Sequence, residues 1–158
     1  MTTTPERSET PHTFVLERTF PVTVDRLWRA LTVDEERAAW FGSEENFDAD
    51  EVSHDFRVGG RTVDDGRWHD GPRSRYVATY TDIVDLVRIV ISYDMWIDGV
   101  HISTSTQCLR LDPVDGGVRL TQTEQGLHLD DPEGGAMRET GFGSILDALA
   151  SHLESSPS

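Results

Sequence analysis

The feature that most constrains the fold is a stretch of alternating apolar and polar residues in the middle of the chain. Between Leu86 and Asp98 the odd positions are all apolar, and most of the even positions in its second half are polar. The apolar positions are Val87, Ile89, Ile91, Tyr93, Met95 and Ile97, and the polar ones include Arg88, Ser92, Asp94 and Asp98. A period of two is typical of an antiparallel strand with one buried face. The sequence therefore predicts a sheet that forms one side of the core.

Further segments with strand character lie on both sides of this strand. They predict strands at about residues 14–20, 52–58, 74–83, 100–111 and 117–125, and another that runs toward Trp68. Gly59-Gly60 predicts a bend, and Asp98-Gly99 and Asp115-Gly116-Gly117 predict tight hairpin turns. Because these turns are short, each strand is expected to pair with its neighbours in sequence.

Two short helices are predicted after the first strand. The first covers about residues 24–31, where the apolar positions at helical spacing are Val24, Leu27, Trp28 and Leu31. The second is predicted from Thr32 and Glu35, which have the spacing of a capping box, to Gly42 as a C-terminal stop.

A long helix is predicted at about residues 135–154. Its apolar stripe consists of Met137, Phe142, Ile145, Leu146, Leu149 and Leu153. Gly141 and Gly143 lie within it, and each interior glycine costs about 1 kcal/mol relative to alanine. This cost predicts that the helix backbone approaches the sheet closely at these two positions.

Together these elements predict an α+β helix-grip fold. A curved antiparallel sheet of about six or seven strands wraps around the long C-terminal helix, and the two short helices follow the first strand. The length of 158 residues suits one domain, expected at residues 13–155 after a disordered tail at residues 1–12. The space between the sheet and the helix is the natural place for a cavity.

The composition excludes several classes of partner. The formal net charge is −15, and all 14 basic residues are arginine, so neither nucleic acid nor an anionic membrane is an expected partner. Cys108 is the only cysteine, the six histidines lack a paired metal-binding spacing, and no metal or cofactor is expected. Residues 1–12 are polar and resemble neither a signal peptide nor a membrane span, so a cytoplasmic protein is expected.

One face of the later strands changes from apolar to polar, which predicts a cavity lining. If Leu109 and Leu111 point inward, the period of two places polar residues of the same strand on that face. The inward face of the next strand also changes from apolar to polar residues. The expected cavity residues are Trp40, Phe41, Tyr80, Tyr93, Met95, His101, Ser103, Ser105, Gln107, Gln122, Glu124 and Phe142. Such a face suits an amphipathic molecule. The alternatives are a register slip of one residue or exposure of this end to solvent.

Several strings, in this order, resemble a known family. They are Val24 with Leu27-Trp28-Arg29-Ala30-Leu31-Thr32, Trp40-Phe41-Gly42, Arg57-Val58-Gly59-Gly60, and Gly141-Phe142 before Leu146, Leu149 and Leu153. The chain resembles the SRPBCC (START and Bet v 1-like) superfamily, and within it the bacterial branch related to the activator of Hsp90 ATPase (AHSA1-like). Tyr93-Asp94-Met95 and Thr123-Glu124-Gln125-Gly126 resemble strings of an uncharacterised bacterial subgroup. The resemblance implies a helix-grip fold with a cavity for a hydrophobic ligand. The chain departs from the family at Phe142, where tryptophan is more common.

The sequence leaves three functions open. The first is binding of a small hydrophobic or amphipathic molecule. The second is a cofactor-independent enzyme, in which Glu124 and His101, with Tyr80, perform acid–base chemistry, because a carboxylate in an apolar cavity has a raised pKa. Glu124 can equally be a structural carboxylate. The third, suggested by resemblance alone, is a chaperone-binding module. Trp96 and an exposed edge strand also leave a homodimer open.

Overall fold

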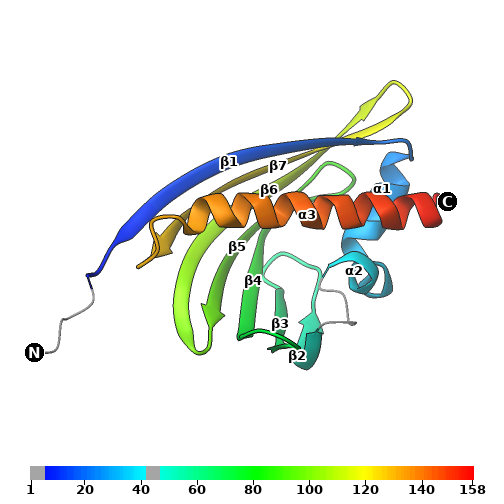
Figure 1. Cartoon of the computed structure of the whole chain (residues 1–158). Helices are drawn as coiled ribbons and strands as arrows, with labels where there is room; N and C mark the ends of the chain where they lie inside the picture. The colour runs from blue at the N-terminus through cyan, green and yellow to red at the C-terminus, as the bar shows by residue number, and fades with distance from the viewer. Residues whose placement is uncertain (1–5, 42–46) are drawn as a thin grey trace, which may run out of the picture.

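The computed structural model describes residues 6–41 and 47–158, which form seven strands and three helices. The strands are β1 (Glu9–Phe20), β2 (Phe47–His54), β3 (Arg61–Trp68), β4 (Arg73–Val84), β5 (Arg88–Ile97), β6 (Val100–Val114) and β7 (Gly117–Leu129). The helices are α1 (Val24–Thr32), α2 (Asp34–Trp40) and α3 (Gly134–Ser155). The sheet curves around α3, which runs along its concave side (Figure 1). The predicted helix-grip α+β fold is therefore confirmed.

The strands form one antiparallel sheet in the order β1-β7-β6-β5-β4-β3-β2. From β2 to β7 each strand pairs with its neighbour in sequence, as the short turns predict. The first strand, β1, pairs with β7 and forms the edge of the sheet opposite β2. At the β5–β6 turn, Asp98 and Gly99 have φ values of 49° and 80°, which are the left-handed conformations that a two-residue hairpin requires.

The first strand begins earlier than the alternation predicts. Residues 9–12 pair with residues 126–129 of β7, so β1 starts at Glu9. The prediction of a disordered tail over residues 1–12 is therefore wrong for residues 9–12, and residues 1–5 lie outside the described residues. The second strand is also displaced: it covers Phe47–His54, whereas the sequence pattern predicts residues 52–58.

The two short helices follow the prediction except at the start of α2. Thr23 caps α1, because its hydroxyl accepts a hydrogen bond from the Arg26 amide at 3.1 Å. The predicted capping box is wrong, since the Thr32 hydroxyl donates to the Trp28 carbonyl at 2.8 Å and Val33 is the N-cap of α2. The predicted stop at Gly42 lies outside the described residues.

The core lies between the sheet and the apolar face of α3. This face buries Phe142, Leu146, Leu149 and Leu153, and α3 packs against β1, β7 and α2. At its C-terminal end, the buried Arg26 guanidinium forms an ion pair with Glu36 at 2.8 Å and donates to the Ser156 carbonyl at 2.7 Å. These contacts join the end of α3 to both short helices.

The prediction about the interior glycines is wrong. A Cβ atom added to Gly141 would meet nothing within 4 Å, and one added to Gly143 would meet only the Arg18 guanidinium at 4.0 Å. The close approach occurs six residues before Gly141, at Gly135, where an added Cβ would lie 2.3 Å from the His12 side chain. The open space beside Gly141 belongs to the hollow described next.

Candidate ligand-binding groove

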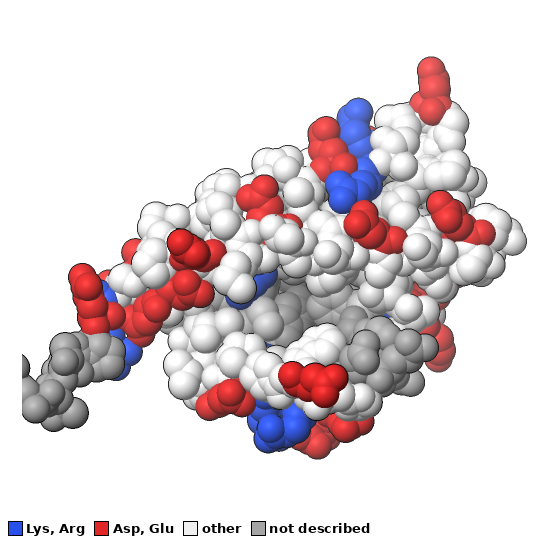
Figure 2. Space-filling view, in the orientation of Figure 1, with Lys and Arg blue, Asp and Glu red and all other residues white. Residues whose placement is uncertain are grey.

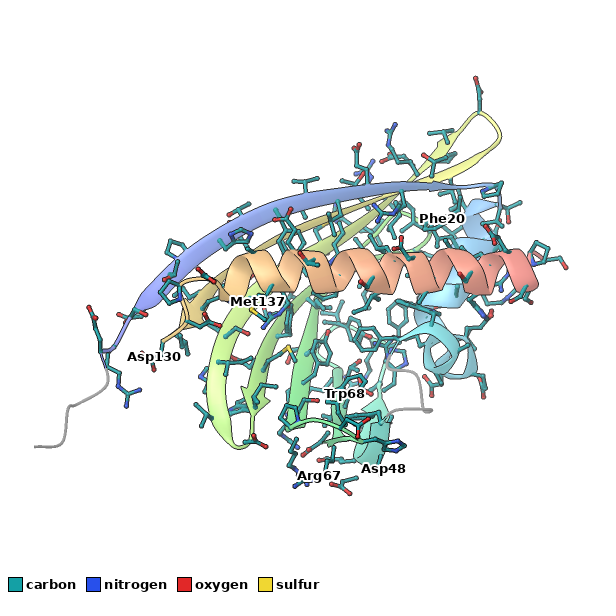
Figure 3. All side chains as sticks on the ribbon, viewed as in Figure 1. Phe20, Asp48, Arg67, Trp68, Asp130 and Met137 are labelled. Atoms are coloured by element: carbon teal, nitrogen blue, oxygen red, sulfur yellow. The ribbon has the colours of Figure 1, made fainter. Side chains whose placement is uncertain are left out.

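A groove of about 1150 Å³ lies between α3, α2 and the sheet. The space-filling view shows this hollow below α3, with mostly uncharged surface around it (Figure 2). Its walls include Met137 on α3 and Trp68 at the end of β3, which are both labelled in Figure 3. Other apolar lining residues are Phe41, Phe47, Val52, Met95, Ile97, Ile102, Phe142 and Ile145. The curvature of the sheet produces the groove, because α3 covers mainly the β1–β7 side and leaves the concave face of β2–β5 open.

A smaller cavity of about 60 Å³ extends from the groove toward the core. The two hollows share six lining residues, namely Arg37, Trp40, Phe41, Tyr76, Phe142 and Ile145. Gln107 and Gln122 form the polar part of the inner wall. Within the described part of the chain, the amide nitrogen of Gln122 has no hydrogen-bond partner. An unpaired buried polar atom costs about 1 to 3 kcal/mol, so this nitrogen favours a ligand with an acceptor atom.

A buried polar network lies behind the wall of the groove, where β5, β6, β7 and α3 meet. The Tyr93 hydroxyl donates to Glu124 Oε2 at 2.7 Å, and the Gln107 amide donates to Glu124 Oε1 at 2.9 Å. Arg138 donates to the Tyr93 hydroxyl at 2.9 Å and to the Ser103 hydroxyl at 2.8 Å. Glu124 is only 2% exposed, whereas Arg138 is half-buried and lines the groove. The network therefore connects a buried carboxylate to a cation at the groove.

Burial dominates the electrostatics of this network. It raises the pKa of Glu124, although the hydrogen bonds from Tyr93 and Gln107 and the charge of Arg138 oppose the change. Burial, and then the Glu124 charge, also raises the pKa of Tyr93, so the tyrosine stays protonated at neutral pH. Burial lowers the pKa of His128, which lines the groove, and the nearby Arg138 charge acts in the same direction. His128 is therefore neutral at neutral pH.

A second polar cluster lies at the α2 end of the groove. His54 Nδ1 contacts the Asp34 carboxylate, and Nε2 lies 2.7 Å from the Tyr80 hydroxyl. Because an ionised carboxylate only accepts, the hydrogen bond to Asp34 assigns a proton to Nδ1. Tyr80 also lies 3.0 Å from the Thr62 hydroxyl. Burial raises the pKa of Asp64, which lines the groove nearby.

The residues expected in the cavity occupy three kinds of position. Trp40, Phe41 and Phe142 line both hollows, Met95 lines the groove, and Tyr80, Gln107 and Gln122 line the inner cavity. Tyr93, Ser103, Ser105 and Glu124 are buried on the same face, but they are covered and line neither hollow. The inward direction of the eight side chains that lie on strands agrees with the period of two, whereas Trp40, Phe41 and Phe142 come from the helices. Their role as a ligand site stays a prediction.

His101 is on the opposite face, so its placement in the cavity is wrong. The β5–β6 register shifts between Met95 and Trp96, and His101 consequently pairs with Trp96. The two rings stack at 5.0 Å between centroids, and His101 Nε2 lies 2.9 Å from the Asp94 carboxylate on the outer face. A β-bulge of this kind turns the side chains beyond it to the other side of the sheet. Ile102 takes the position in the groove.

Sequence reasoning missed the basic residues of the groove, Arg37 and Arg138. The sequence contained a signal for Arg138, because it precedes Phe142 by four residues and therefore continues the apolar stripe of α3. A charged residue at an inward helical position indicates a special role. Within residues 6–41 and 47–158, no group of three metal-ligating side chains comes together. None of the described helices has the length and apolar character to cross a membrane.

A sheet that grips a long C-terminal helix and leaves a groove beside it defines the helix-grip class of α+β proteins. Residues 21–154 match the family described as Activator of Hsp90 ATPase homolog 1-like protein, and the chain belongs to this AHSA1-like family. Proteins of this family have the SRPBCC fold.

Solved structures of similar proteins support the assignment. The Mll3558 protein from Rhizobium loti is 38% identical, with a TM-score of 0.85 over 92% of this chain and 99% of that chain. An uncharacterized protein from Rhizobium leguminosarum is 33% identical, with a TM-score of 0.87 over 94% and 98% of the two chains. An AHSA1-like protein from Aeromonas hydrophila is 18% identical over 92% and 94% of the two chains, and its TM-score of 0.66 shows the fold alone. A comparison with curated proteins found no match.

Proposed function

We propose that this protein binds a small amphipathic molecule in the groove between α3 and the concave face of the sheet. The observation that carries the proposal is a hollow of about 1150 Å³ with apolar walls and a polar end. Binding sites for small molecules are typically hollows of about 300 to 1000 Å³ with few, well-placed polar groups. At the end opposite α2, the polar group is Arg138, held by Tyr93 and Ser103.

Exposed apolar side chains on the groove walls support the same proposal. Met137 is 69% exposed, Val52 is 62% exposed and Trp68 is 38% exposed, and all three line the groove. Each Å² of apolar surface removed from water contributes about 25 cal/mol. A ligand body that lies against these side chains would gain this contribution, and the polar end would fix its orientation.

The acid–base enzyme is not supported in the form expected from the sequence, because its three residues do not meet. Glu124 is enclosed by its network, His101 is on the outer face, and Tyr80 belongs to the cluster at the α2 end. The family description names the Hsp90 ATPase. We base no proposal on that name, since a shared fold does not carry over a partner.

Two glycines of α3 provide a matched test of groove binding. A tryptophan at Gly141 would project into the groove, where an added Cβ has open space, whereas Gly143 is not part of the lining. Thermal unfolding with a panel of amphipathic acids, alcohols and amines should show stabilisation of the wild type, by about 2.7 kcal/mol at a ligand concentration of 100 Kd. Gly141→Trp should weaken binding of any such compound about tenfold or more, and Gly143→Trp should not. The proposal fails if no compound stabilises the wild type, or if both variants bind as the wild type does.

A further inference from the structure

The ionic partners of the arginines single out two residues of the groove. Nine of the 14 arginines have a carboxylate within 4.0 Å. Arg61, Arg67 and Arg119 have none among the described residues, but they are exposed to solvent. The remaining two, Arg37 and Arg138, are half-buried, and both line the groove. This chain has 29 acidic residues, so partially buried arginines without an ionic partner among residues 6–41 and 47–158 are a conspicuous exception.

Arg138 is positioned to bind a further acceptor. It donates to two neutral hydroxyls, those of Tyr93 and Ser103, and its guanidinium carbon lies 5.6 Å from the Tyr93 ring centroid. A guanidinium has five N–H donors, so three remain for other groups. The two hydroxyls fix the plane of the guanidinium at the groove wall. A group held in this way loses little conformational entropy when a ligand binds.

The charges around Arg138 limit what kind of acceptor fits. Glu124 is the nearest buried acid, but its two oxygens already accept from Tyr93 and Gln107, and Tyr93 separates it from Arg138. Asp131 also lines the groove, and neutral His128 lies nearby. Glu139, which follows Arg138 in the sequence, is an acid with a partner of its own, because His12 Nε2 lies 3.1 Å from its carboxylate. One accessible positive charge among these acids favours a singly charged anion over a doubly charged phosphate.

Arg37 is a weaker candidate for the same role. Its guanidinium carbon lies 4.8 Å from the Phe41 ring centroid, so one face is covered. Its charge also acts on the carboxyl of Asp64, whose pKa it lowers against the effect of burial. Arg37 therefore has a nearby acid on the groove wall, whereas the acid nearest Arg138 is already hydrogen-bonded.

We propose that the ligand is an amphipathic carboxylic acid whose carboxylate binds Arg138. Its apolar body would lie against Met95, Ile97 and Ile102 of the sheet and Met137 and Phe142 of α3, which line the groove together with Arg138. A guanidinium binds a planar carboxylate through two parallel hydrogen bonds, which gives orientation as well as affinity. This inference depends on the proposed function and adds the chemical class of the ligand to it.

Decanoate and 1-decanol test the inference, because they share a chain and differ in the head group. At neutral pH the wild type should bind decanoate about tenfold or more tightly than the alcohol, the factor that one charge-assisted hydrogen bond supplies. Arg138→Gln should remove this preference and leave the affinity for the alcohol within about threefold. Arg138→Lys keeps the charge and should retain part of the preference. Arg119→Gln changes the net charge equally at an exposed site and should behave as the wild type.

The outcomes separate the two levels of the proposal. Equal binding of decanoate and decanol to the wild type would overturn the carboxylate preference and leave groove binding in place. Loss of both affinities in Arg138→Gln by the same factor would also overturn it, and circular dichroism with urea unfolding would show whether that variant is folded. Binding of neither probe, with no compound of the wider panel stabilising the wild type, would overturn groove binding itself.

Discussion

Removing the Tyr93 hydroxyl tests whether the buried network contributes to stability. Tyr93 is 1% exposed, and its hydroxyl both donates to Glu124 and accepts from Arg138. In Tyr93→Phe, Glu124 Oε2 loses its donor in a site that water does not reach. Arg138 loses less, because it is half-buried and can turn toward the groove. The cost at Glu124 therefore dominates.

The magnitude follows from the charge of the acceptor. A hydrogen bond to a charged group contributes about 1.5 to 3 kcal/mol, so Tyr93→Phe should lower the free energy of unfolding by about 2 kcal/mol. For a chain of this length that corresponds to a decrease of about 4 to 8 °C in Tm. The loss should be smaller in acid, where Glu124 is protonated and needs a donor less.

Urea unfolding followed by tryptophan fluorescence measures this change, provided that the m-value stays constant. Tyr76→Phe is the matched control, because its ring lies 5.0 Å from that of Tyr93 and its hydroxyl has no hydrogen bond to any of the described residues. That variant should change the stability by less than about 0.5 kcal/mol. If the two variants are equally stable at neutral pH, the network does not stabilise the fold.

Two further predictions concern Glu124 and the glycines of α3. The pKa of Glu124 is raised above its ordinary value of 4.5, so the folded state holds a proton that the unfolded chain releases. The wild type should therefore lose stability relative to Glu124→Gln as the pH rises from about 4.5 through the raised pKa. Urea unfolding at each pH measures this change, and a difference in the free energy of unfolding between the two proteins that stays constant with pH would contradict it. Gly141→Ala should stabilise α3 by up to about 1 kcal/mol, because the added methyl has open space. Gly135→Ala should destabilise the protein, because the methyl would collide with His12. If thermal unfolding showed Gly135→Ala to be more stable than Gly141→Ala, the described packing of α3 at these two glycines would be wrong.

The parts of the fold that follow local rules were predictable from the sequence. Strict alternation located β5, and Asp98-Gly99 located the hairpin after it, because both signals depend on adjacent residues. The direction of Gln107, Gln122 and Glu124 followed from the same period of two. These predictions needed no knowledge of distant contacts.

The errors had both tertiary and local causes. The bulge after Met95 exists only in the pairing of two strands, and it moved His101 to the outer face. The capping box at Thr32 failed for a local reason, because Thr32 is the last residue of α1 and its hydroxyl donates to the Trp28 carbonyl of the same helix. Arg138 was missed because the apolar stripe was read from the residues that fit the pattern, whereas the informative residue was the one that broke it. A register shift is a tertiary feature that a single window of sequence does not show, whereas the spacing that places Arg138 on the inward face of α3 was present in the sequence.

The division of the sheet between its two sides has a consequence for how such proteins diversify. The scaffold comes from the two ends of the chain, since α3 packs on β1 and β7, whereas much of the opposite wall of the groove comes from β2 and its neighbours. β2 has no fully buried residue. Substitutions in β2 should therefore alter what the protein recognises at little thermodynamic cost, so natural drift or directed evolution could retarget the groove while the remainder of the molecule stays intact.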